Sequence, residues 1–296
     1  MLSYVGQCDD GRDAISVLKY YKKHKISPVH LQQKVDGVEV AVGRYFNGND
    51  WVGPININFE HKPLCNGDIG PLTAEMGTLA WYDDDETLPI YQETLAKLKP
   101  FLQRINYKGD IDINCMADER GVWPLEATMR LGTPITELQC EIHRSPWGEF
   151  MKAIADGKPY ELEYNRGYAI VVAVMVPPFP FAPEVIGESP LQTSQGTSIF
   201  FKEQLTQAEF DQIHFEEVSI EKDEDNELFH YLAGKHGYAL YVTGHGDTVT
   251  EAQASAYNII NKIIIPRMFY RSDIGDRFLR EDKQKLEDWG WLKPKV

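Results

Sequence analysis

The sequence predicts an α+β fold, with strands and helices in largely separate runs. Apolar and polar residues alternate between 31 and 60, and Asn47-Gly48 is a strong hairpin signal within this stretch. Apolar residues at helical spacing in 9–24 and 248–263 indicate a helix on either side of the strands. These observations together indicate an antiparallel β meander accompanied by helices.

In the first third of the chain, the pattern predicts a helix over 9–24 whose start Asp10 or Asp13 can cap. Strands are expected at 31–35, 38–43 and 55–59. Val38, Val40 and Val42 alternate with polar or small residues, which predicts that Glu39 faces away from the valines. A second helix is expected over 86–105, with an interruption at Pro100.

The middle of the chain predicts a hairpin that carries polar side chains on one face. Asp110, Asp112 and Asn114 alternate with apolar residues, and 119–121 forms a turn signal before a returning strand at 122–127. Such a hairpin brings Glu126 close to Asn114 or Asp112. A short helix at 149–156 follows, closed by Gly157.

Prolines at 177, 178, 180 and 183 interrupt the pattern before the last third of the chain. Strands are expected at 198–201, 215–220 and 238–242, followed by the helix at 248–263 with Thr248 or Thr250 as its cap. We expect two domains, residues 1–160 and 161–296.

Composition limits the classes of function. The 296 residues carry a net charge of −15 and a pI of about 5.0, which argues against a nucleic-acid surface. The cysteines at 8, 65, 115 and 140 match no zinc-site spacing, so reduced thiols are expected. No signal segment is recognised, and the longest apolar run, 169–176, is too short to span a bilayer. These features are typical of a cytoplasmic protein.

The segment 67–78, GDIGPLTAEMGT, is expected to be a loop. It contains three glycines, one proline, two acids and two threonines, a composition that helices and central strands do not tolerate. Glycines let a backbone approach a ligand and turn its N–H groups toward anionic oxygens. With His61 and Lys62 just before it, the segment suggests a site for a phosphorylated small molecule. The alternative is an ordinary surface loop.

The predicted hairpin offers a metal site. Magnesium prefers hard oxygen ligands and shares carboxylates with substrate phosphates, which suits Glu126 with Asn114 or Asp112. The alternative is a polar strand face in contact with water. Arg130 follows Glu126 by four residues and suits bidentate recognition of a carboxylate or phosphate, the alternative being a surface cation. The histidines show no metal-ligand pair, and no serine sits in a nucleophile elbow.

Several motifs resemble phosphoribosylamine–glycine ligase, an ATP-grasp enzyme. They are LQQKVDGVEVAV (31–42), FEHKPLCNGDIGPLTAEMGT (59–78), PLEATMRLGTP (124–134), GYALYVTGHGDTVTEAQASAYNII (237–260) and FYRSDIGDRF (269–278). The resemblance runs over nearly the whole chain, but only to the later part of the family. It implies an ATP-grasp fold followed by a small mixed C-terminal domain.

The resemblance also implies roles for individual residues. Gln32 and Val35 would lie at the adenine, and Glu39 would hold the ribose. Glu126 would bind Mg²⁺ or Mn²⁺, aided by Thr128, Asn114 and Asp112. Arg130 and Lys62 would be catalytic. The substrate pocket would be formed by His61, Asp68, Gly70, Pro71, Thr73, Met76 and Gly77. The implied reaction activates glycine with ATP to an acyl phosphate, which the amine of phosphoribosylamine then attacks.

The chain also departs from the family. The family begins with a substrate-binding domain, a glycine-rich loop and a lysine over the ATP phosphates, none of which occurs here. Thr128 replaces the metal-ligand asparagine, and Leu72 and Glu75 alter the loop. We therefore expect a C-terminal component that works with a separate N-terminal chain, or a self-associating one. The alternatives are an ATP-grasp ligase of different substrates and a non-catalytic nucleotide-binding relic.

Overall fold

The computed structural model describes residues 4–182 and 193–294, so Pro183 of the proline cluster lies outside the described residues. The chain separates into two units, Met1–Gly37 and Val38–Val296. The first unit contains α1 (Arg12–Lys23), close to the predicted helix. Its N-cap is Gly11, which makes no side-chain cap bond. Of the two predicted capping residues, Asp10 accepts from the backbone N–H of Arg12 at the start of the helix, whereas Asp13 accepts from the backbone N–H of Gln7. The predicted strand at 31–35 is irregular, because no strand pairs with it among the described residues.

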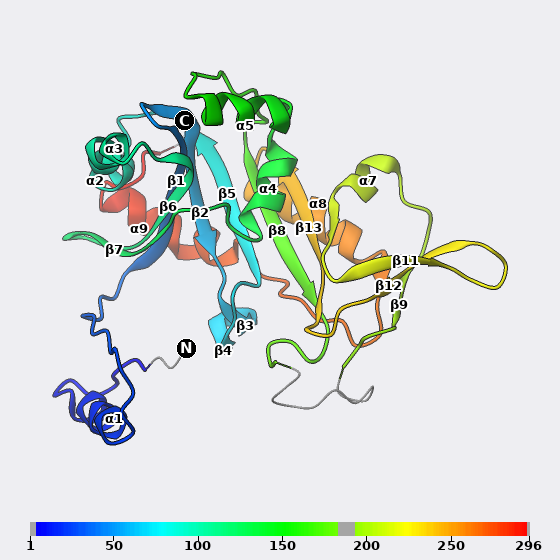
Figure 1. The fold of residues 1–296 in the computed structure, drawn as a ribbon, viewed down its shortest axis with the longest axis horizontal. Helices are drawn as coiled ribbons and strands as arrows, with labels where there is room; N and C mark the ends of the chain where they lie inside the picture. Colours follow the sequence, from blue (N-terminus) through cyan, green and yellow to red (C-terminus); the bar gives the residue numbers. More distant parts are fainter. Residues whose placement is uncertain (1–3, 183–192, 295–296) are drawn as a thin grey trace. The chain divides into compact units, whose positions relative to one another are not determined.

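The second unit is built on an eight-stranded antiparallel sheet, counted over the described residues (Figure 1). The strands follow the order β10-β13-β8-β5-β2-β1-β6-β7. Their bounds are β1 (Val38–Asn47), β2 (Trp51–Glu60), β5 (Gly77–Asp83), β6 (Lys108–Asp118), β7 (Gly121–Thr128), β8 (Tyr168–Met175), β10 (Ile213–Phe215) and β13 (Tyr238–Gly246). The predicted hairpins β1–β2 and β6–β7 are both confirmed.

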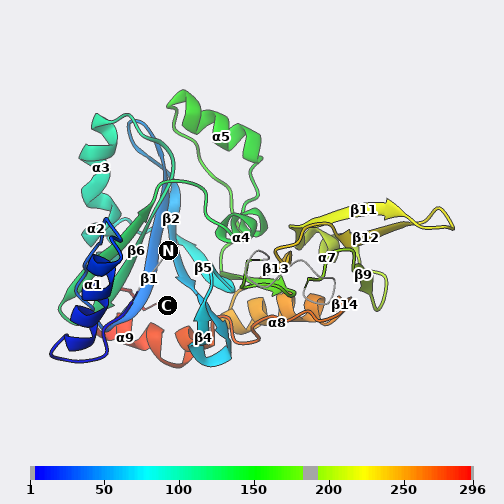
Figure 2. The ribbon, with the colours of Figure 1, turned by 60° about the horizontal axis from the view of Figure 1, so that its bottom comes forward.

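Each face of this sheet packs on its own apolar core. The valines of β1 join one core with helix α8 (Val249–Ile260) and helix α9 (Lys283–Asp288). The other core contains α4 (Ile135–Ile142) and α5 (Trp147–Asp156). Figure 2 shows α4 and α8 on opposite faces of the strands. The alternation along β1 therefore directs Glu39 to the α4 face, away from the valines, as the sequence predicts.

The predicted helix over 86–105 is two helices, α2 (Pro89–Glu93) and α3 (Leu95–Arg104). The break lies at Thr94, whose backbone is not helical (φ −117°, ψ −99°), and not at Pro100, which is inside α3. The Thr94 hydroxyl donates to the carbonyl of Ile90 and so satisfies a group at the end of α2. Two end signals are confirmed: Gly157 closes α5 with φ 73°, and Thr248 caps α8 in a capping box.

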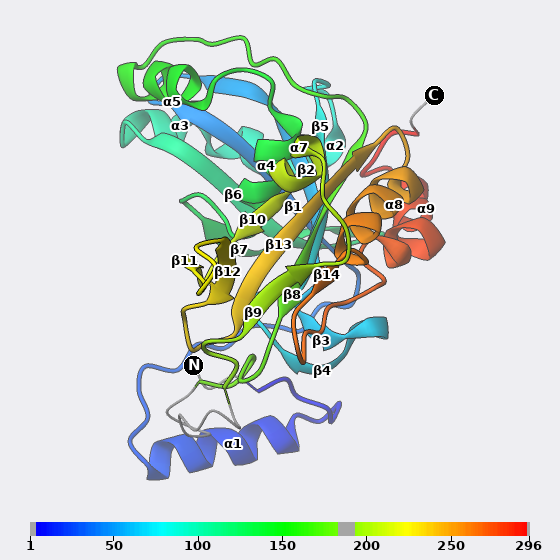
Figure 3. The ribbon, with the colours of Figure 1, turned by 90° about the vertical axis from the view of Figure 1, so that its right-hand side faces the viewer.

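The last third adds a small sheet in the order β11-β12-β9-β14 (Figure 3). Its strands are β9 (Ser198–Phe201), β11 (Val218–Lys222), β12 (Leu228–Leu232) and β14 (Ile263–Ile264), and the short helix α7 (Gln207–Asp211) precedes β10. The predicted strand at 215–220 is thus divided between β10 and β11. The domain division near residue 160 stays a prediction; the eight-stranded sheet takes strands from both sides of it.

The glycine-rich segment is more regular than predicted. Ile69–Leu72 (β4) pairs with Pro63–Cys65 (β3), and Gly77 already begins the central strand β5. The turn between β3 and β4 is tight because Gly67 and Asp68 both adopt positive φ. The first half of this segment, 67–72, is therefore part of a small exposed ribbon rather than a loop. Nowhere in the described residues is a helix long and apolar enough to cross a membrane.

Candidate ligand-binding cavity

A polar cavity of about 250 Å³ lies on the α4 face of the large sheet. Its floor comes from β2 and β6, and α4 and the segment after the β3–β4 ribbon close it. The acidic and basic side chains that line it are Glu60, Lys62, Glu75, Asp110, Asp112, Glu126 and Arg130. The amide side chains are Asn56, Asn58, Asn114 and Gln139. The lining therefore carries five carboxylates against two cations.

The β6–β7 hairpin places the predicted metal ligands together. Asn114 lies opposite Glu126, and Asp112 lies opposite Thr128. Glu126 is exposed, whereas Asn114 is buried and donates its amide N–H to Glu60 at 3.0 Å. This hydrogen bond leaves the Asn114 oxygen as the atom that can face a cation.

Two buried amides continue the cavity floor along β2. The Asn58 amide donates to Asn56 Oδ1 and to Asp112 Oδ2, both at 2.9 Å. Three buried atoms of this group, Asn56 Nδ2, Asn58 Oδ1 and Asp112 Oδ1, have no hydrogen-bond partner in the described part of the chain. An unpaired buried polar atom costs about 1–3 kcal/mol. Such a cost is expected where a ligand completes the hydrogen bonds.

The deep carboxylates hold their protons more tightly than usual. Burial, followed by the charge of Glu60, raises the pKa of Asp112 to about 7. Burial and the neighbouring Asp112 raise the pKa of Asp110 well above its usual range. Burial, followed by Glu60, raises the pKa of Glu75. Raised pKa values favour the protonated, neutral forms of these carboxyl groups, and burial is the main cause in each case.

Neither cation of the lining forms an ion pair with Glu75, Asp110 or Asp112 among the described residues. Lys62 Nζ forms ion pairs with Glu39 at 2.8 Å and with Glu60 at 3.0 Å. Burial opposes the charge of Lys62, but the two carboxylates outweigh it and raise its pKa. Arg130 is exposed and donates to the carbonyl of Leu131 at 2.9 Å. Glu39 thus reaches the cavity only through Lys62.

The residues predicted for a substrate pocket lie mainly outside this lining. Asp68 accepts hydrogen bonds from Arg271 at 2.7 Å and from Arg277 at 2.6 Å, which fixes the β3–β4 turn to the segment 271–282. Both arginines also lower the pKa of Asp68 against the effect of burial. Gly70 and Pro71 are exposed on β4. Asp68 therefore belongs to an ion-pair cluster rather than to the cavity wall.

Thr73, Met76 and Gly77 support the backbone around Lys62. The Thr73 hydroxyl donates to the Lys62 carbonyl at 2.7 Å. Met76 is fully buried in the core that contains α4, and a Cβ at Gly77 would lie 2.5 Å from the carbonyl oxygen of Val171. These positions shape the start of β5, and a role for them in binding a substrate stays a prediction.

His61 is buried beside the Asp68 cluster, and its Nε2 accepts from the N–H of Gly275 at 3.3 Å. Burial, followed by the charge of Arg271, lowers its pKa to about 4, so the ring is neutral at neutral pH.

Gln32 and Val35 belong to the first unit and lie in its irregular segment. The predicted roles of Gln32 and Val35 at an adenine, and of Glu39 at a ribose, stay predictions.

Sequence reasoning assigned no role in the site to Glu60, Glu75, Asp110, Asn56 or Asn58. For most of these residues, the alternation of polar and apolar positions along the strand indicated which face of the sheet they share. Residues 56, 58 and 60 alternate with Ile55, Ile57 and Phe59, and Asp110 shares a face with Asp112. Glu75 had no such signal, because it follows the ribbon and its position depends on how the ribbon folds back.

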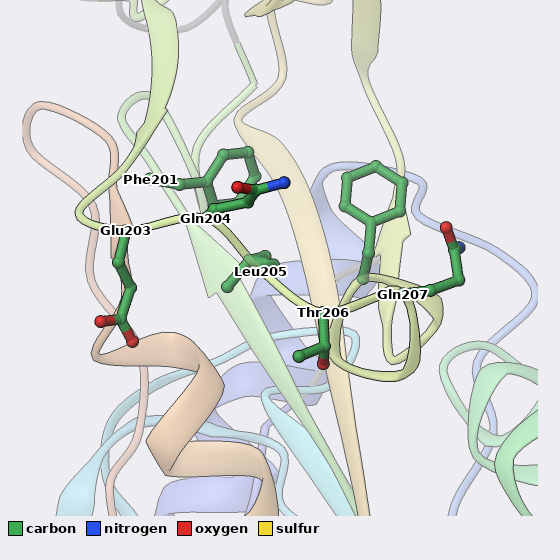
Figure 4. A pocket seen from close by; sticks show the side chains of 7 residues that line it. Phe201, Glu203, Gln204, Leu205, Thr206 and Gln207 are labelled. Atoms are coloured by element: carbon green, nitrogen blue, oxygen red, sulfur yellow. The ribbon is translucent and has the colours of Figure 1, made fainter.

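A second hollow, of about 330 Å³, lies between β9 and α7 (Figure 4). Its lining is Phe201, Glu203, Gln204, Leu205, Thr206, Gln207 and Phe210. Glu203 is paired with Lys262 at 2.6 Å, and Thr206 is used in the cap of α7. Its volume is larger, but it does not gather unpaired polar groups as the acidic cavity does.

The donor set of the acidic cavity fits a hard cation at its outer side. Glu126, the Asn114 oxygen and the unpaired Asp112 Oδ1 are oxygen donors of the kind that magnesium prefers. Over residues 4–182 and 193–294, no three His, Cys, Asp or Glu side chains gather closely enough to hold a metal by themselves. Magnesium would therefore need further oxygens from water or a substrate, as is usual for this ion.

Taken together, the fold and site define an α+β protein with an acidic small-molecule cavity on one face of an antiparallel sheet. The chain resembles the later portion of phosphoribosylamine–glycine ligase. It is 27% identical over 257 residues to that enzyme of Corynebacterium ammoniagenes and 25% identical over 282 residues to that of Clostridium acetobutylicum. These alignments cover 84% and 90% of this chain, but 55% and 62% of the relatives.

Solved structures agree with this likeness. Phosphoribosylamine–glycine ligase from Thermotoga maritima matches 82% of this chain and 57% of its own, with 25% identity and a TM-score of 0.57. A phosphoribosylglycinamide synthetase from Anaerococcus prevotii, at 11% identity and a TM-score of 0.53, shows the fold alone. No family profile matches the chain. The chain thus spans between half and two thirds of the length of these relatives.

Proposed function

We propose that the chain is part of an ATP-dependent ligase that joins a carboxylate to an amine, with an ATP-grasp fold. The observation that carries this proposal is the convergence of Lys62, Asp112, Asn114, Glu126 and Arg130 on one cavity in a chain that resembles phosphoribosylamine–glycine ligase. By the name of its relatives, glycine and phosphoribosylamine are the first substrates to test.

In the proposed reaction, the carboxylate attacks the γ-phosphorus of ATP, forming an acyl phosphate and releasing ADP. The amine then forms the C–N bond while the acyl C–O bond breaks, and phosphate leaves with the bonding electrons. The chain contributes positioning and charge neutralisation rather than a covalent intermediate. Arg130, exposed at the rim, is placed to hold an anionic oxygen, and Lys62 is held in its charged form by Glu39 and Glu60.

Magnesium or manganese, when bound, would neutralise phosphate charge during phosphoryl transfer. Glu126, Asn114 and Asp112 would hold it, and Thr128, opposite Asp112 on β7, would offer a hydroxyl where the family has an amide. The phosphate-binding loop and lysine of the family would come from segments outside this sequence, whether in the same chain or in a partner. As an alternative to a separate partner chain, we propose that the chain associates with itself. Size-exclusion chromatography with light scattering tests this, because it measures the molar mass in solution.

Calorimetric titration of Mg·ATP into the chain tests the proposal. We expect binding, and we expect Glu126→Gln to weaken it at least tenfold, because this change removes a charged metal ligand. Glu224→Gln is the matched control, since it makes the same chemical change at an exposed loop position. Both proteins should unfold at the same temperature, because neither side chain is buried.

Equal Mg·ATP affinity for Glu126→Gln and the unchanged chain would contradict the proposed metal site. A second assay would add the missing N-terminal segments of the relatives together with glycine and phosphoribosylamine. Mg·ATP binding without ADP formation in this mixture would favour the non-catalytic alternative. ADP formation with another carboxylate and amine would favour a ligase of different substrates. The acidic lining of the cavity is the observation that favours this second alternative.

A further inference from the structure

Helix α1 has an apolar face that the first unit does not bury. Ala14, Val17, Leu18 and Tyr21 recur at helical spacing and so share one face, yet no residue of α1 is buried. The unit that contains them, Met1–Gly37, is shorter than the roughly 40 residues below which a domain rarely builds a sufficient core of its own. This face is therefore suited to pack against another surface.

The end of α1 and the residues directly after it are basic. Exposed lysines stand at positions 19, 22, 23 and 25, and none of them forms an ion pair in the described part of the chain, where the ion pairs of this unit are Arg12–Asp10 and Lys34–Asp36. Six basic and four acidic residues give Met1–Gly37 a net charge of +2, so the −15 of the whole chain leaves −17 on Val38–Val296. The charge of α1 thus favours an acidic partner surface.

The β11–β12 hairpin of the second unit has the complementary composition. Every residue of 220–228 is exposed, and Ile220 and Leu228 are 55% and 68% exposed. Because Ile220 lies opposite His230 and Leu228 lies opposite Lys222, these two apolar side chains are diagonal neighbours on one face of the hairpin. The acidic residues around them are Glu221, Asp223, Glu224, Asp225 and Glu227, and none of these has an ion pair among the described residues.

The place of the hairpin in the second unit favours a second copy of the chain as its partner. The hairpin follows β10, the edge strand of the large sheet, and Figure 2 shows β11 and β12 extending away from that sheet. The first unit leads into β1, which β2, β5 and β8 separate from β13. A second copy can meet the hairpin without its first unit having to span the sheet.

We propose that helix α1 of one copy packs against the β11–β12 hairpin of a second copy. Val17, Leu18 and Tyr21 would cover Ile220 and Leu228. The lysines of α1 would meet the acidic residues of the hairpin, and such opposite charges around an apolar contact set its partner and orientation. The inference gives a surface to the self-association proposed above, and it needs no ligase activity.

Sedimentation velocity of the full chain over a range of concentrations tests the contact. We expect association that is weaker in about 0.5 M than in about 0.05 M NaCl, because salt screens exposed charges. The double change Lys22→Glu with Lys23→Glu should weaken association at least tenfold, and so should Glu224→Lys with Asp225→Lys. A mixture of these two double variants should associate again, because the acidic helix of one copy then meets the basic hairpin of the other.

The control changes the net charge without touching either surface. Arg104→Glu with Arg280→Glu alters the net charge by the same amount as the double change in α1, at exposed positions elsewhere in the chain, and should leave association unchanged. Thermal unfolding of each variant confirms that it is folded.

A monomer at every concentration would overturn the proposal, and so would association that both double variants retain. Failure of the mixture to associate would also overturn it, because the contact would then not join α1 of one copy to the hairpin of another. These outcomes are distinguishable from a failure of the proposed function. That function is tested by Mg·ATP binding with Glu126→Gln, at a cavity whose lining includes none of the residues changed here.

Discussion

Two buried groups of charges in the second unit are built in opposite ways. Around Asp68, each buried charge has a partner: Arg271, 1% exposed, contacts Asp68 and Asp273, and Arg277 contacts Asp68 and Asp282. In the cavity, Glu75, Asp110 and Asp112 have no cation in contact within the described residues. A paired cluster fixes structure, whereas an unpaired one indicates a ligand site.

The difference explains why Asp68 and Glu75 have different roles although they stand seven positions apart. Asp68 lies in the tight turn of the ribbon, where Arg271 reaches it from the C-terminal segment. Glu75 lies beyond the ribbon, where the chain turns inward toward β5 and meets other carboxylates. Whether an acid in this segment is structural or available to a ligand thus depends on the partner it meets, not on its spacing in the sequence.

The largest expected effect comes from breaking the paired cluster. Arg271→Ala should lower the free energy of unfolding by about 3–5 kcal/mol, because it removes a fully buried side chain and leaves the partly buried Asp273 without its arginine and Asp68 with Arg277 alone. Urea unfolding followed by fluorescence measures this change. Arg280→Ala is the control, since this arginine is exposed on the same segment and should change stability by less than about 0.5 kcal/mol. A loss below about 1 kcal/mol for Arg271→Ala would show that the cluster does not hold the ribbon.

A smaller effect is expected where the ribbon meets the sheet. A Cβ at Gly77 would lie 2.5 Å from the Val171 carbonyl oxygen and 2.8 Å from Ile274, next to the Arg271 segment. Gly77→Ala should therefore cost about 1–3 kcal/mol in urea unfolding. Gly148→Ala, a glycine in α5 with open space around it, should be neutral or stabilising. Equal stability of the two variants would mean that β5 shifts freely and that this contact does not position the ribbon.

Local patterns predicted the β6–β7 hairpin and its polar face well. A period of two fixes which residues share a face, so Asp112, Asn114 and Glu126 follow directly from alternation once the turn at 119–121 is recognised. The same reasoning predicted that Glu39 faces away from the valines of β1. Both predictions concern neighbours along a hairpin, which short-range chemistry determines.

Long-range contacts explain what the sequence did not predict. Asp68 is bound by residues more than 200 positions away, whereas composition alone predicted a loop there. The helix breaks at Thr94 instead of Pro100, and residues on both sides of the break, Ile90 and Leu95, are buried in the core with the sheet. Glu75 enters the cavity because the ribbon folds back onto Lys62 through Thr73. No pattern within a short window contains these contacts.

The smallest expected effect tests the unpaired cavity through its pH dependence. Because burial raises the pKa of Glu75, the folded chain keeps a proton that the unfolded chain has already lost. The stability linked to this proton is full below the ordinary glutamate pKa and declines as the pH rises toward the folded value. Glu75→Gln has no proton to lose, so its unfolding free energy should fall less between pH 5 and pH 8. At pH 8 the variant should be more stable than the unchanged chain by roughly 1 kcal/mol. Parallel pH profiles for the two proteins would mean that Glu75 already has a partner in solution, and the contrast with the paired Asp68 cluster would then fail.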